Sequence, residues 1–519
     1  MSLPSECTIL VIGGGNAGFS AALRAAESGA KDVLIIDKCP EEWAGGNSYF
    51  TAGAYRTVHD GLEDLLPIVN NVDPATAEKI DMSPYTADDF MHDLIRITSG
   101  RSHPDLARIL VRDSNETIKW LATQGVRFQL SFNRQAYEVD GRIKFWGGMS
   151  LKTEDGGKGL IQDYRRAAEK LGVSVHFSTA AKSLVMDPET GRITSVIVVH
   201  EGREREIKAK AVILAAGGFE ANPRMRAQYL GPNWDMAMVR GTPYNTGECL
   251  EMAIRDVSAK QAGNWSGCHS VAWDANAPPN SGDREVSNQF TKSGYPLGIM
   301  VNREGERFVD EGADMRNFTY AIFGKAILHQ PGHIAFQIWD SRMTPWLRQE
   351  EYRDEVVRRI TAQTVPDLAH SCAEHGLQNK LKFEDTLKEY NRAVYEWRRE
   401  NQSAKWDPAI KDGMSTQSSS GGINPPKSNW AQPIDLPPYL AVKVSCGITF
   451  TFGGLAVDPE TAAVISSVTN APIPGLYCAG EMLGGLFYDN YPGGSGLTAG
   501  AVFGRRAGHS AAAAAAAMA

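Results

Sequence analysis

The sequence has little of what marks several large classes of protein. Its seven cysteines are scattered and form no Cys-x-x-Cys pair, which argues against an iron–sulfur centre or a structural zinc on this chain and favours a reducing compartment. No apolar stretch reaches membrane-spanning length, and the alanine run at 511–517 is expected to be a frayed helical tail. The net charge of -8 comes without a basic block, which argues against a nucleic-acid partner. We therefore expect a soluble, cytoplasmic protein with no membrane span and no bound metal.

A glycine-rich segment near the N-terminus has the order of features that binds a dinucleotide. Gly13-x-Gly15-x-x-Gly18 lies between an apolar run and a helix-like stretch, and the next apolar run ends in Asp37. The first glycine allows the tight turn, the second lets the backbone approach the pyrophosphate, and the third lets helix and strand pack closely. The phosphates then meet the helix N-terminus, and Asp37 accepts the ribose hydroxyls. The segment predicts a dinucleotide cofactor.

The C-terminal end indicates which dinucleotide this is. Residues 473–481 are typical of a short strand feeding a glycine turn, and residues 492–497 open a helix rich in alanine and glycine. A nicotinamide-binding domain has no need for a second phosphate-and-ring site so far along the chain, whereas a flavoprotein does. The loop at 45–48 and the buried strand ending at 215–218 agree, because their small residues let a cofactor lie close. We predict FAD.

A change of pattern near residue 272 predicts a second domain. Irregular, aromatic-rich segments begin there, residues 383–397 carry a helical apolar stripe, and prolines from 425 onward indicate a linker back to the first domain. A chain of 519 residues with 42% hydrophobic content can bury two cores. The predicted fold class is α/β, a Rossmann-like FAD-binding domain with an inserted α+β capping domain that binds the substrate. Its predicted parts are 1–271 and 433–519 for the FAD-binding domain and 272–432 for the cap.

These motifs resemble the flavoprotein family of fumarate reductases and succinate dehydrogenases from about residue 7 to residue 508, and within that family the FAD-dependent tricarballylate dehydrogenases. The segments that carry the likeness are 295–302, 305–317, 446–454 and 490–497. The resemblance implies an oxidoreductase that introduces or removes a carbon–carbon double bond next to a carboxylate. Such a reaction needs a hydride to leave one carbon for flavin N5 and a group that takes the proton from the neighbouring carbon.

The resemblance also implies roles for three residues. Arg316 matches the arginine that carries the proton, and this use requires burial and a neighbouring acid, for which Asp310, Glu311 and Asp314 are the candidates. A structural ion pair that holds the cap is the alternative role for Arg316. His269 matches a histidine that binds a substrate carboxylate, the alternative being an ordinary core histidine. The predicted catalytic residues are Arg316, Tyr491 and His269.

Two positions depart from the fumarate reductase pattern. Thr449-Phe450-Thr451 stands in place of a substrate-binding histidine, and Tyr491 stands in place of an arginine that clamps a carboxylate. A phenol cannot replace the charge of a guanidinium, so compact four-carbon dicarboxylates are disfavoured. The Tyr-Pro-Gly segment also resembles 3-ketosteroid dehydrogenases, where the tyrosine helps polarise a ketone. A desaturase or ene-reductase of a ketone, steroid-like compound or secondary metabolite is therefore the alternative, together with a non-catalytic FAD subunit.

The resemblance implies how the cofactor is held. Asn47 stands where succinate dehydrogenases carry the histidine that bonds covalently to FAD, so the flavin is expected to be noncovalent. The expected partners are a small-molecule substrate with a carboxylate and a separate electron acceptor or O2. The predicted cofactor-binding residues are Gly13, Gly15, Asn16, Ala17, Gly18, Asp37, Lys38, Gly45, Gly46, Asn47, Ser48, Gly53, Ala181, Ala215, Gly217, Thr246, Glu481, Gly494, Ser495 and Leu497.

Overall fold

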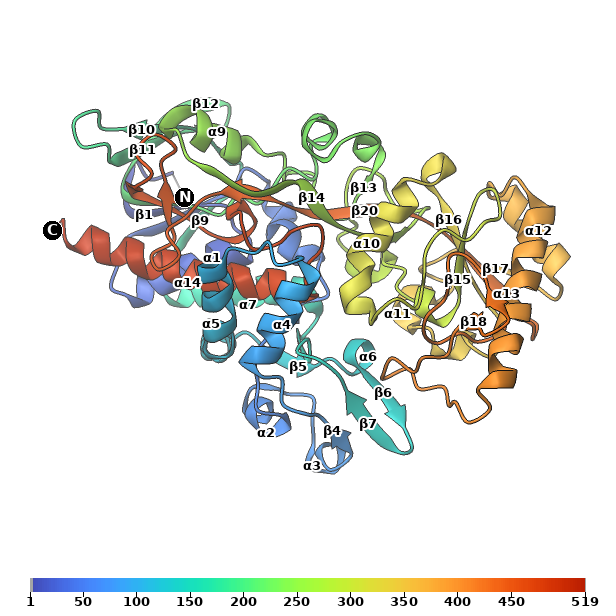
Figure 1. Cartoon of the computed structure of the whole chain (residues 1–519). Helices are drawn as coiled ribbons and strands as arrows, with labels where there is room; N and C mark the ends of the chain where they lie inside the picture. Colours follow the sequence, from blue (N-terminus) through green and yellow to red (C-terminus); the bar gives the residue numbers. More distant parts are fainter. Residues whose placement is uncertain (1–2, 519) are drawn as a thin grey trace.

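Two β-sheets organise the chain in the computed structural model, which describes residues 3–518 (Figure 1). The first sheet has the strand order β10-β11-β12-β1-β2-β9, with β22 beside β12 and β21 beside β22. Its strands are β1 (Glu6–Ile12), β2 (Val33–Ile36), β9 (Ser174–His176), β10 (Thr179–Met186), β11 (Ile193–His200), β12 (Arg203–Leu214), β21 (Ala463–Ile465) and β22 (Pro472–Cys478). The pairs β1–β12, β1–β2, β2–β9 and β12–β22 are parallel.

The parallel part of this sheet is covered on both faces, which explains the unbroken apolar run of β1. Ile9, Leu10 and Val11 are fully buried, as parallel strands with helices on either side require. Helix α1 (Asn16–Glu27) begins directly after the glycine turn that follows β1. Because parallel strands end at the same edge, the loops after β1, β2, β12 and β22 meet there, where open α/β sheets bind their ligands. The predicted α/β architecture is confirmed.

The C-terminal helix α14 (Ser495–Ala516) packs closely against α1 because it presents glycines at intervals of four residues. A Cβ at Gly504 would lie 2.6 Å from the carbonyl oxygen of Ala17, and a Cβ at Gly508 would overlap the carbonyl oxygen of Ala21. The alanine run at its end is not frayed as expected. It stays helical to Ala516, and one face of it (Ala511, Ala512 and Ala515) is buried, because small side chains let the helix pack closely on the first domain.

The second sheet has the order β13-β20-β16-β15, with β14 and β17 also paired to β20. Its strands are β13 (Met238–Val239), β14 (Gln261–Asp274), β15 (Ile299–Asn302), β16 (Ala335–Trp339), β17 (Ile360–Ala362) and β20 (Tyr439–Leu455). The long antiparallel pair β14–β20 runs from the first lobe into the second (Figure 1). The predicted domain boundaries fall near the end of β14 and just before β20, and they stay a prediction.

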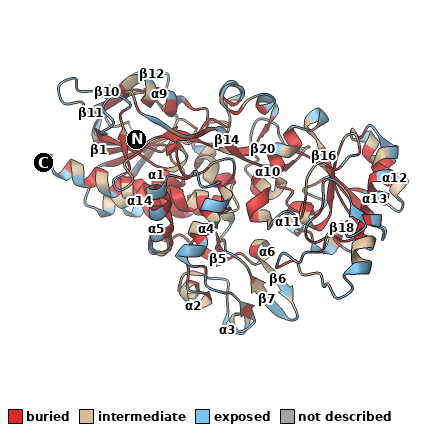
Figure 2. Ribbon diagram, in the orientation of Figure 1, coloured by how far each residue is buried: buried red, intermediate tan, exposed pale blue. Residues whose placement is uncertain are grey.

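Helices cover both sheets. Those of eight or more residues, besides α1 and α14, are α4 (Ala87–Ile97), α5 (Pro104–Thr123), α7 (Gly156–Lys170), α9 (Glu248–Val257), α10 (Arg316–Leu328), α12 (Val365–Glu374) and α13 (Lys380–Glu400). The apolar stripe predicted at 383–397 lies on α13, where Phe383, Leu387, Tyr390 and Val394 are buried. Figure 2 shows buried residues gathered inside each lobe. Within residues 3–518, no helix combines the length and the apolar character that crossing a membrane requires.

Candidate active site

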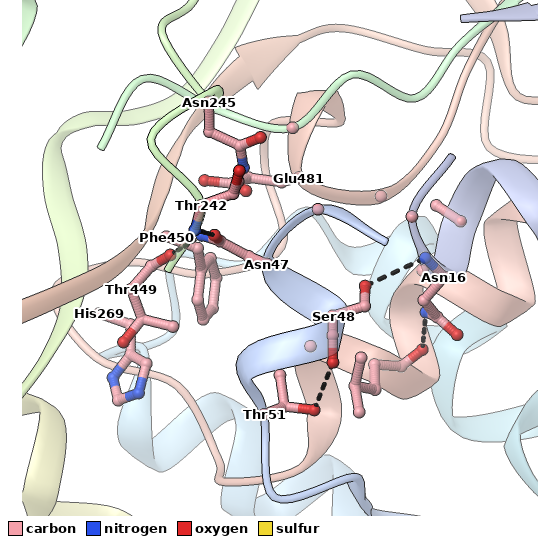
Figure 3. Close-up of a pocket in the computed structure, with 18 of the residues that line it drawn as sticks. Asn16, Asn47, Ser48, Thr51, Thr242, Asn245, His269, Thr449, Phe450 and Glu481 are labelled. Carbon is pink, nitrogen blue, oxygen red and sulfur yellow. Dashed lines mark hydrogen bonds between the residues drawn. The ribbon is translucent and has the colours of Figure 1, made fainter. Parts of the chain in front are cut away.

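One long cavity joins the carboxyl edge of the first sheet to the start of α10 and the middle of β20. Figure 3 shows the part of it around Asn16, Asn47 and His269. All three predicted catalytic residues, Arg316, Tyr491 and His269, line it. It is also lined by the following predicted cofactor residues: Gly13, Gly15, Asn16, Ala17, Asp37, Lys38, Gly46, Asn47, Ser48, Ala181, Ala215, Gly217, Glu481, Gly494 and Leu497. The sequence positions singled out for cofactor and catalysis therefore share one space.

The glycine turn after β1 is shaped by close backbone contacts. Gly13 has a φ of +109°, and a Cβ there would overlap the carbonyl of Ala215. A Cβ at Gly18 would overlap the carbonyl oxygen of Gly13, so the third glycine lets α1 pack against the turn. Asp37 accepts a hydrogen bond from the backbone N–H of Gly14 at 2.9 Å and so holds the turn. Contacts within the protein therefore set the shape of this turn.

Five of the predicted cofactor residues do not line the cavity, namely Gly18, Gly45, Gly53, Thr246 and Ser495. Each is next in the chain to a residue that does. Gly45, with a φ of +104°, packs on Ile161, and Thr246 hydrogen-bonds to Lys38, which also forms an ion pair with Glu248 at 2.8 Å. These five residues do not face the cavity but support the residues that line it.

Asn47, at the position where a covalent flavin bond is expected in succinate dehydrogenases, has both ends of its side-chain amide held by hydrogen bonds, and Figure 3 shows it beside Thr242 and Thr449. Its amide nitrogen donates to the carboxylate of Glu220 and to the backbone carbonyl of Thr449. Its amide oxygen accepts from the backbone N–H of Thr242 at 2.9 Å. An amide fixed in this way positions the loop of η2 (Gly46–Phe50) against β20.

His269 from β14 meets two tyrosines inside the cavity. Its ring centroid lies 4.7 Å from that of Tyr320 and 4.8 Å from that of Tyr491, both edge to face, and the two phenol oxygens are hydrogen-bonded to each other. Burial, and then the charge of Arg240, hold the pKa of His269 well below its usual value. The imidazole is therefore neutral at neutral pH. Burial also raises the pKa of Tyr491, so its phenol stays protonated.

Arg240 is a buried arginine that sequence reasoning missed, and it lies beside this cluster. Its guanidinium donates to the hydroxyl of Thr449 at 2.9 Å, to Nε2 of His269 at 3.4 Å and to the side-chain oxygen of Asn288. No carboxylate among the described residues forms an ion pair with it. It follows the short strand β13 in a segment without a recognisable motif, so only its neighbours in space reveal it.

Arg316 begins α10 and faces the same cavity from the cap side. Its guanidinium donates to the backbone carbonyl of Arg134. Burial, and then the positive charge of Arg348, lower the pKa of Arg316 to about 10. Within residues 3–518, Arg316 has no ion pair with a carboxylate.

The acids expected beside Arg316 have other partners, so that expectation is wrong. Asp310 accepts hydrogen bonds from Ser428. Glu311 forms an ion pair with Arg307, and Asp314 forms ion pairs with Arg96 and Lys411. The three carboxylates therefore pair with other residues, which for Asp314 include Arg96 on α4 of the first lobe, and not with Arg316.

The acid of this region is Glu351, on α11 (Gln349–Tyr352), a short helix that sequence reasoning did not identify. It accepts hydrogen bonds from the N–H and hydroxyl of Ser293 at 2.9 and 2.7 Å, and forms ion pairs with Arg348 at 2.9 Å and Arg134 at 3.5 Å. Burial alone would raise the pKa of Glu351, but the two arginines and Ser293 outweigh it and lower the pKa to about 2. Glu351 is ionised at neutral pH and neutralises the arginines behind Arg316.

The comparisons with known proteins agree on one family. Residues 8–497 match the family described as FAD binding domain. A probable fumarate reductase, Ifc3, of Shewanella frigidimarina (strain NCIMB 400) is 28% identical over 515 residues, which is 98% of this chain and 75% of that protein. The open conformation of a flavocytochrome c3 fumarate reductase aligns with a TM-score of 0.71 at 26% identity, covering 99% of this chain and 79% of that chain.

A second solved structure shares the fold. A 3-ketosteroid Δ1-dehydrogenase from Sterolibacterium denitrificans, in complex with 1,4-androstadiene-3,17-dione, aligns with a TM-score of 0.72 at 20% identity. The alignment covers 98% of this chain and 100% of that chain. At this level of identity the likeness concerns the arrangement of the elements alone.

Proposed function

This chain belongs to the FAD binding domain family and is an FAD-dependent oxidoreductase of the fumarate reductase type that acts on carbon–carbon bonds, and we propose that its substrate carries a carboxylate beside that bond. The cavity fits the cofactor. Its small residues at Gly13, Ala215 and Gly217 let an extended dinucleotide lie against the backbone, and the side chain of Asn47 offers no nucleophile for a covalent bond to the flavin. We therefore propose that FAD is held noncovalently.

The observation that supports a carboxylate substrate is a pair of cavity arginines, the buried Arg240 and the half-buried Arg316, without acidic partners. Arg240 and Arg316 both line the cavity, and among the described residues neither forms an ion pair. A buried charge without a partner is costly, so such arginines favour an anion in the space between them. Each can bind a carboxylate through two N–H groups. A substrate with more than one carboxylate would pair with both arginines, and tricarballylate is the candidate that we propose.

The proposed mechanism divides the work between the cofactor and the side chains. Bound FAD supplies the hydride acceptor or donor. Arg240 and the hydroxyl of Thr449 hold one carboxylate, with neutral His269 beside them as a further donor. Arg316 exchanges a proton with the substrate carbon next to the one that exchanges the hydride. Its pKa is lowered to about 10, so it gives up its proton more easily than an ordinary arginine does. Glu351 keeps the surrounding arginines neutralised and fixed in place.

A second candidate function has one observation in its favour. Tyr320 and Tyr491 are hydrogen-bonded through their phenol oxygens inside the cavity. Two protonated phenols in this position form a donor site for the oxygen of a ketone, as in a desaturase or ene-reductase of a ketone or steroid-like compound. Inhibition separates the two candidates: small polycarboxylates should compete with a carboxylate substrate and should have little effect on a neutral ketone.

The decisive experiment uses two arginine variants and one control. With tricarballylate, and with other polycarboxylates if it is inert, bleaching of the flavin absorbance is followed without oxygen. Arg316→Lys should lower kcat at least about 100-fold with a smaller change in KM, as expected for loss of an acid–base group. Arg240→Gln should instead raise KM about ten-fold or more, because a charged hydrogen bond is worth about 1.5 to 3 kcal/mol. Arg96→Lys, outside the cavity, should change neither.

Two outcomes would count against this function. A raised KM with retained kcat in Arg316→Lys would make Arg316 a simple carboxylate clamp and move the proton to Tyr491, which Tyr491→Phe then tests. Full activity of Arg240→Gln on a carboxylate, or turnover of neutral ketones alone, would favour the second candidate.

A further inference from the structure

Two buried glutamates meet beside the cofactor end of the cavity. Glu220 lies in the loop after β12 and is fully buried. Glu481 lies in η10 (Gly480–Met482), after β22, and lines the cavity next to Asn245 and Asn47 (Figure 3). The proposed substrate chemistry uses neither residue. Their carboxyl groups lie within hydrogen-bonding reach of each other.

Neutral groups surround this acid pair. Glu220 Oε1 accepts from the side-chain amides of Asn245, at 2.6 Å, and Asn47. Glu481 Oε1 accepts from the backbone N–H of Thr451 at 2.7 Å and from its hydroxyl at 3.2 Å. Among the described residues, no N–H or hydroxyl reaches Glu220 Oε2. A proton shared with Glu481 can supply the donor that this oxygen lacks.

No cation neutralises the pair. Arg226, on η4 (Arg226–Leu230), donates to the backbone carbonyl of Glu220 at 2.6 Å and not to its carboxylate. Cys268 on β14 is close enough for the charge of Glu220 to contribute to the raised pKa of its thiol. No ion pair of the described residues includes either glutamate. Two adjacent carboxylates that are buried and have no cation beside them cannot both be ionised, because like charges in a poorly solvated space repel strongly.

The charge balance decides which glutamate carries the proton. Burial, and then the charge of Glu481, raise the pKa of Glu220 well above its usual range. Burial raises the pKa of Glu481 to about 7, and there the hydrogen bonds from Glu220 and Thr451 favour the charged form. Glu220 is thus the proton donor of the pair, and Glu481 carries its negative charge in the cavity wall.

We propose that Glu220 and Glu481 share one proton while the flavin is oxidised and take up a second proton from solvent when the flavin is reduced. The negative charge gained on reduction would favour protonation of a neighbouring carboxylate. The step balances simply: one H⁺ from water adds to a carboxylate oxygen, and no electron moves to or from the pair. It would make flavin reduction pH-dependent whatever the substrate, so it does not depend on the carboxylate proposal.

The first test measures the reduction potential of bound FAD against pH, with a chemical reductant and no substrate. For a two-electron couple, each proton taken up changes the potential by 29.6 mV per pH unit, which is the value for a tenfold change in the equilibrium constant. Around neutral pH, the potential of Glu481→Gln should fall less steeply with pH than that of the wild type, by the amount that corresponds to one proton, and the potential should be higher. The reason is that Glu220 alone stays protonated whether the flavin is oxidised or reduced. Glu248→Gln is the matched control, since Glu248 also lines the cavity but pairs with Lys38 and is partly exposed. An unchanged slope in Glu481→Gln would overturn the proposal.

The second test remains informative if Glu481→Gln fails to retain FAD. Above neutral pH, Glu220 of the oxidised wild type should be protonated and Glu481 should be ionised. Infrared spectra of the wild type should therefore show the carbonyl stretch of one protonated carboxyl, and this band should be missing from Glu220→Gln. Reduction of the wild type should add a second such band. Spectra in which Glu220→Gln removes no protonated carboxyl, or in which reduction adds none, would also overturn the proposal.

Discussion

Replacing Glu351 with glutamine tests the charge balance on which the substrate end of the cavity depends. Glu351 is fully buried between Arg348 and Arg134, and its pKa is lowered from 4.5 to about 2. At 1.36 kcal/mol per pH unit, this lowering corresponds to about 3.4 kcal/mol of stability from the charged form. Removing one member of a buried ion-pair group costs about 3 to 5 kcal/mol. At neutral pH we expect Glu351→Gln to lower the free energy of unfolding by about 3 kcal/mol.

The sign of the pH dependence follows from the direction of the pKa. A carboxylate with a lowered pKa in the folded protein contributes stability above its unfolded pKa of 4.5, and that stability is lost as the pH falls through about 2. The difference in the free energy of unfolding between wild type and Glu351→Gln should therefore be largest at neutral pH and should become smaller below a pH of about 4.5. Urea unfolding followed by tryptophan fluorescence across this pH range measures it.

Glu350→Gln is the matched control for this prediction. Glu350 is the neighbouring residue and also pairs with Arg134, but its side chain is 30% exposed. Loss of such a solvated pair should cost less than about 1 kcal/mol. The reasoning is refuted if both variants lose the same stability, or if the loss in Glu351→Gln does not depend on pH, because either result would mean that burial of the ion pairs does not stabilise the cap.

Three further predictions concern the cofactor domain. Asp37→Ala should weaken FAD binding about ten-fold or more in a fluorescence titration, because it removes a charged acceptor worth about 1.5 to 3 kcal/mol, and unchanged affinity would place the ribose elsewhere. Acid precipitation should release the flavin into solution, and colour that stays with the polypeptide would reveal a covalent bond. Gly508→Ala should destabilise by about 1 to 3 kcal/mol, since its Cβ would overlap the carbonyl oxygen of Ala21, whereas Ala513→Ser, exposed on the same helix, should be nearly neutral in thermal unfolding.

Local patterns in the sequence were enough to predict the elements whose shape depends on consecutive residues. The glycine turn between β1 and α1 has its conformation set by Gly13 and Gly18, and the predicted order of strand, turn, helix and strand is confirmed. The stripe at 383–397 predicted α13 because a helix brings residues three and four apart onto one face. The family resemblance extended this to the whole FAD-binding frame.

The sequence did not predict which charged residues pair with one another. Asp310, Glu311 and Asp314 are close to Arg316 along the chain, yet Asp310 and Asp314 pair with residues from other segments and Glu311 pairs with Arg307, four residues before it. The acid of this region, Glu351, lies on a short helix without a motif. Spacing along the chain says little about which charges meet when the residues belong to different elements.

The sequence by itself determined the cofactor class and the parallel α/β frame, because each depends on continuous motifs, and the family resemblance singled out His269, Arg316 and Tyr491, which all line the cavity. Only the tertiary structure decided that Arg240 joins them without an acidic partner, and that Glu220 and Glu481 meet beside the flavin end of the cavity. The physical reason is the range of the interactions. Turn and helix geometry act over a few residues, whereas burial and electrostatic coupling depend on which distant segments the fold brings together.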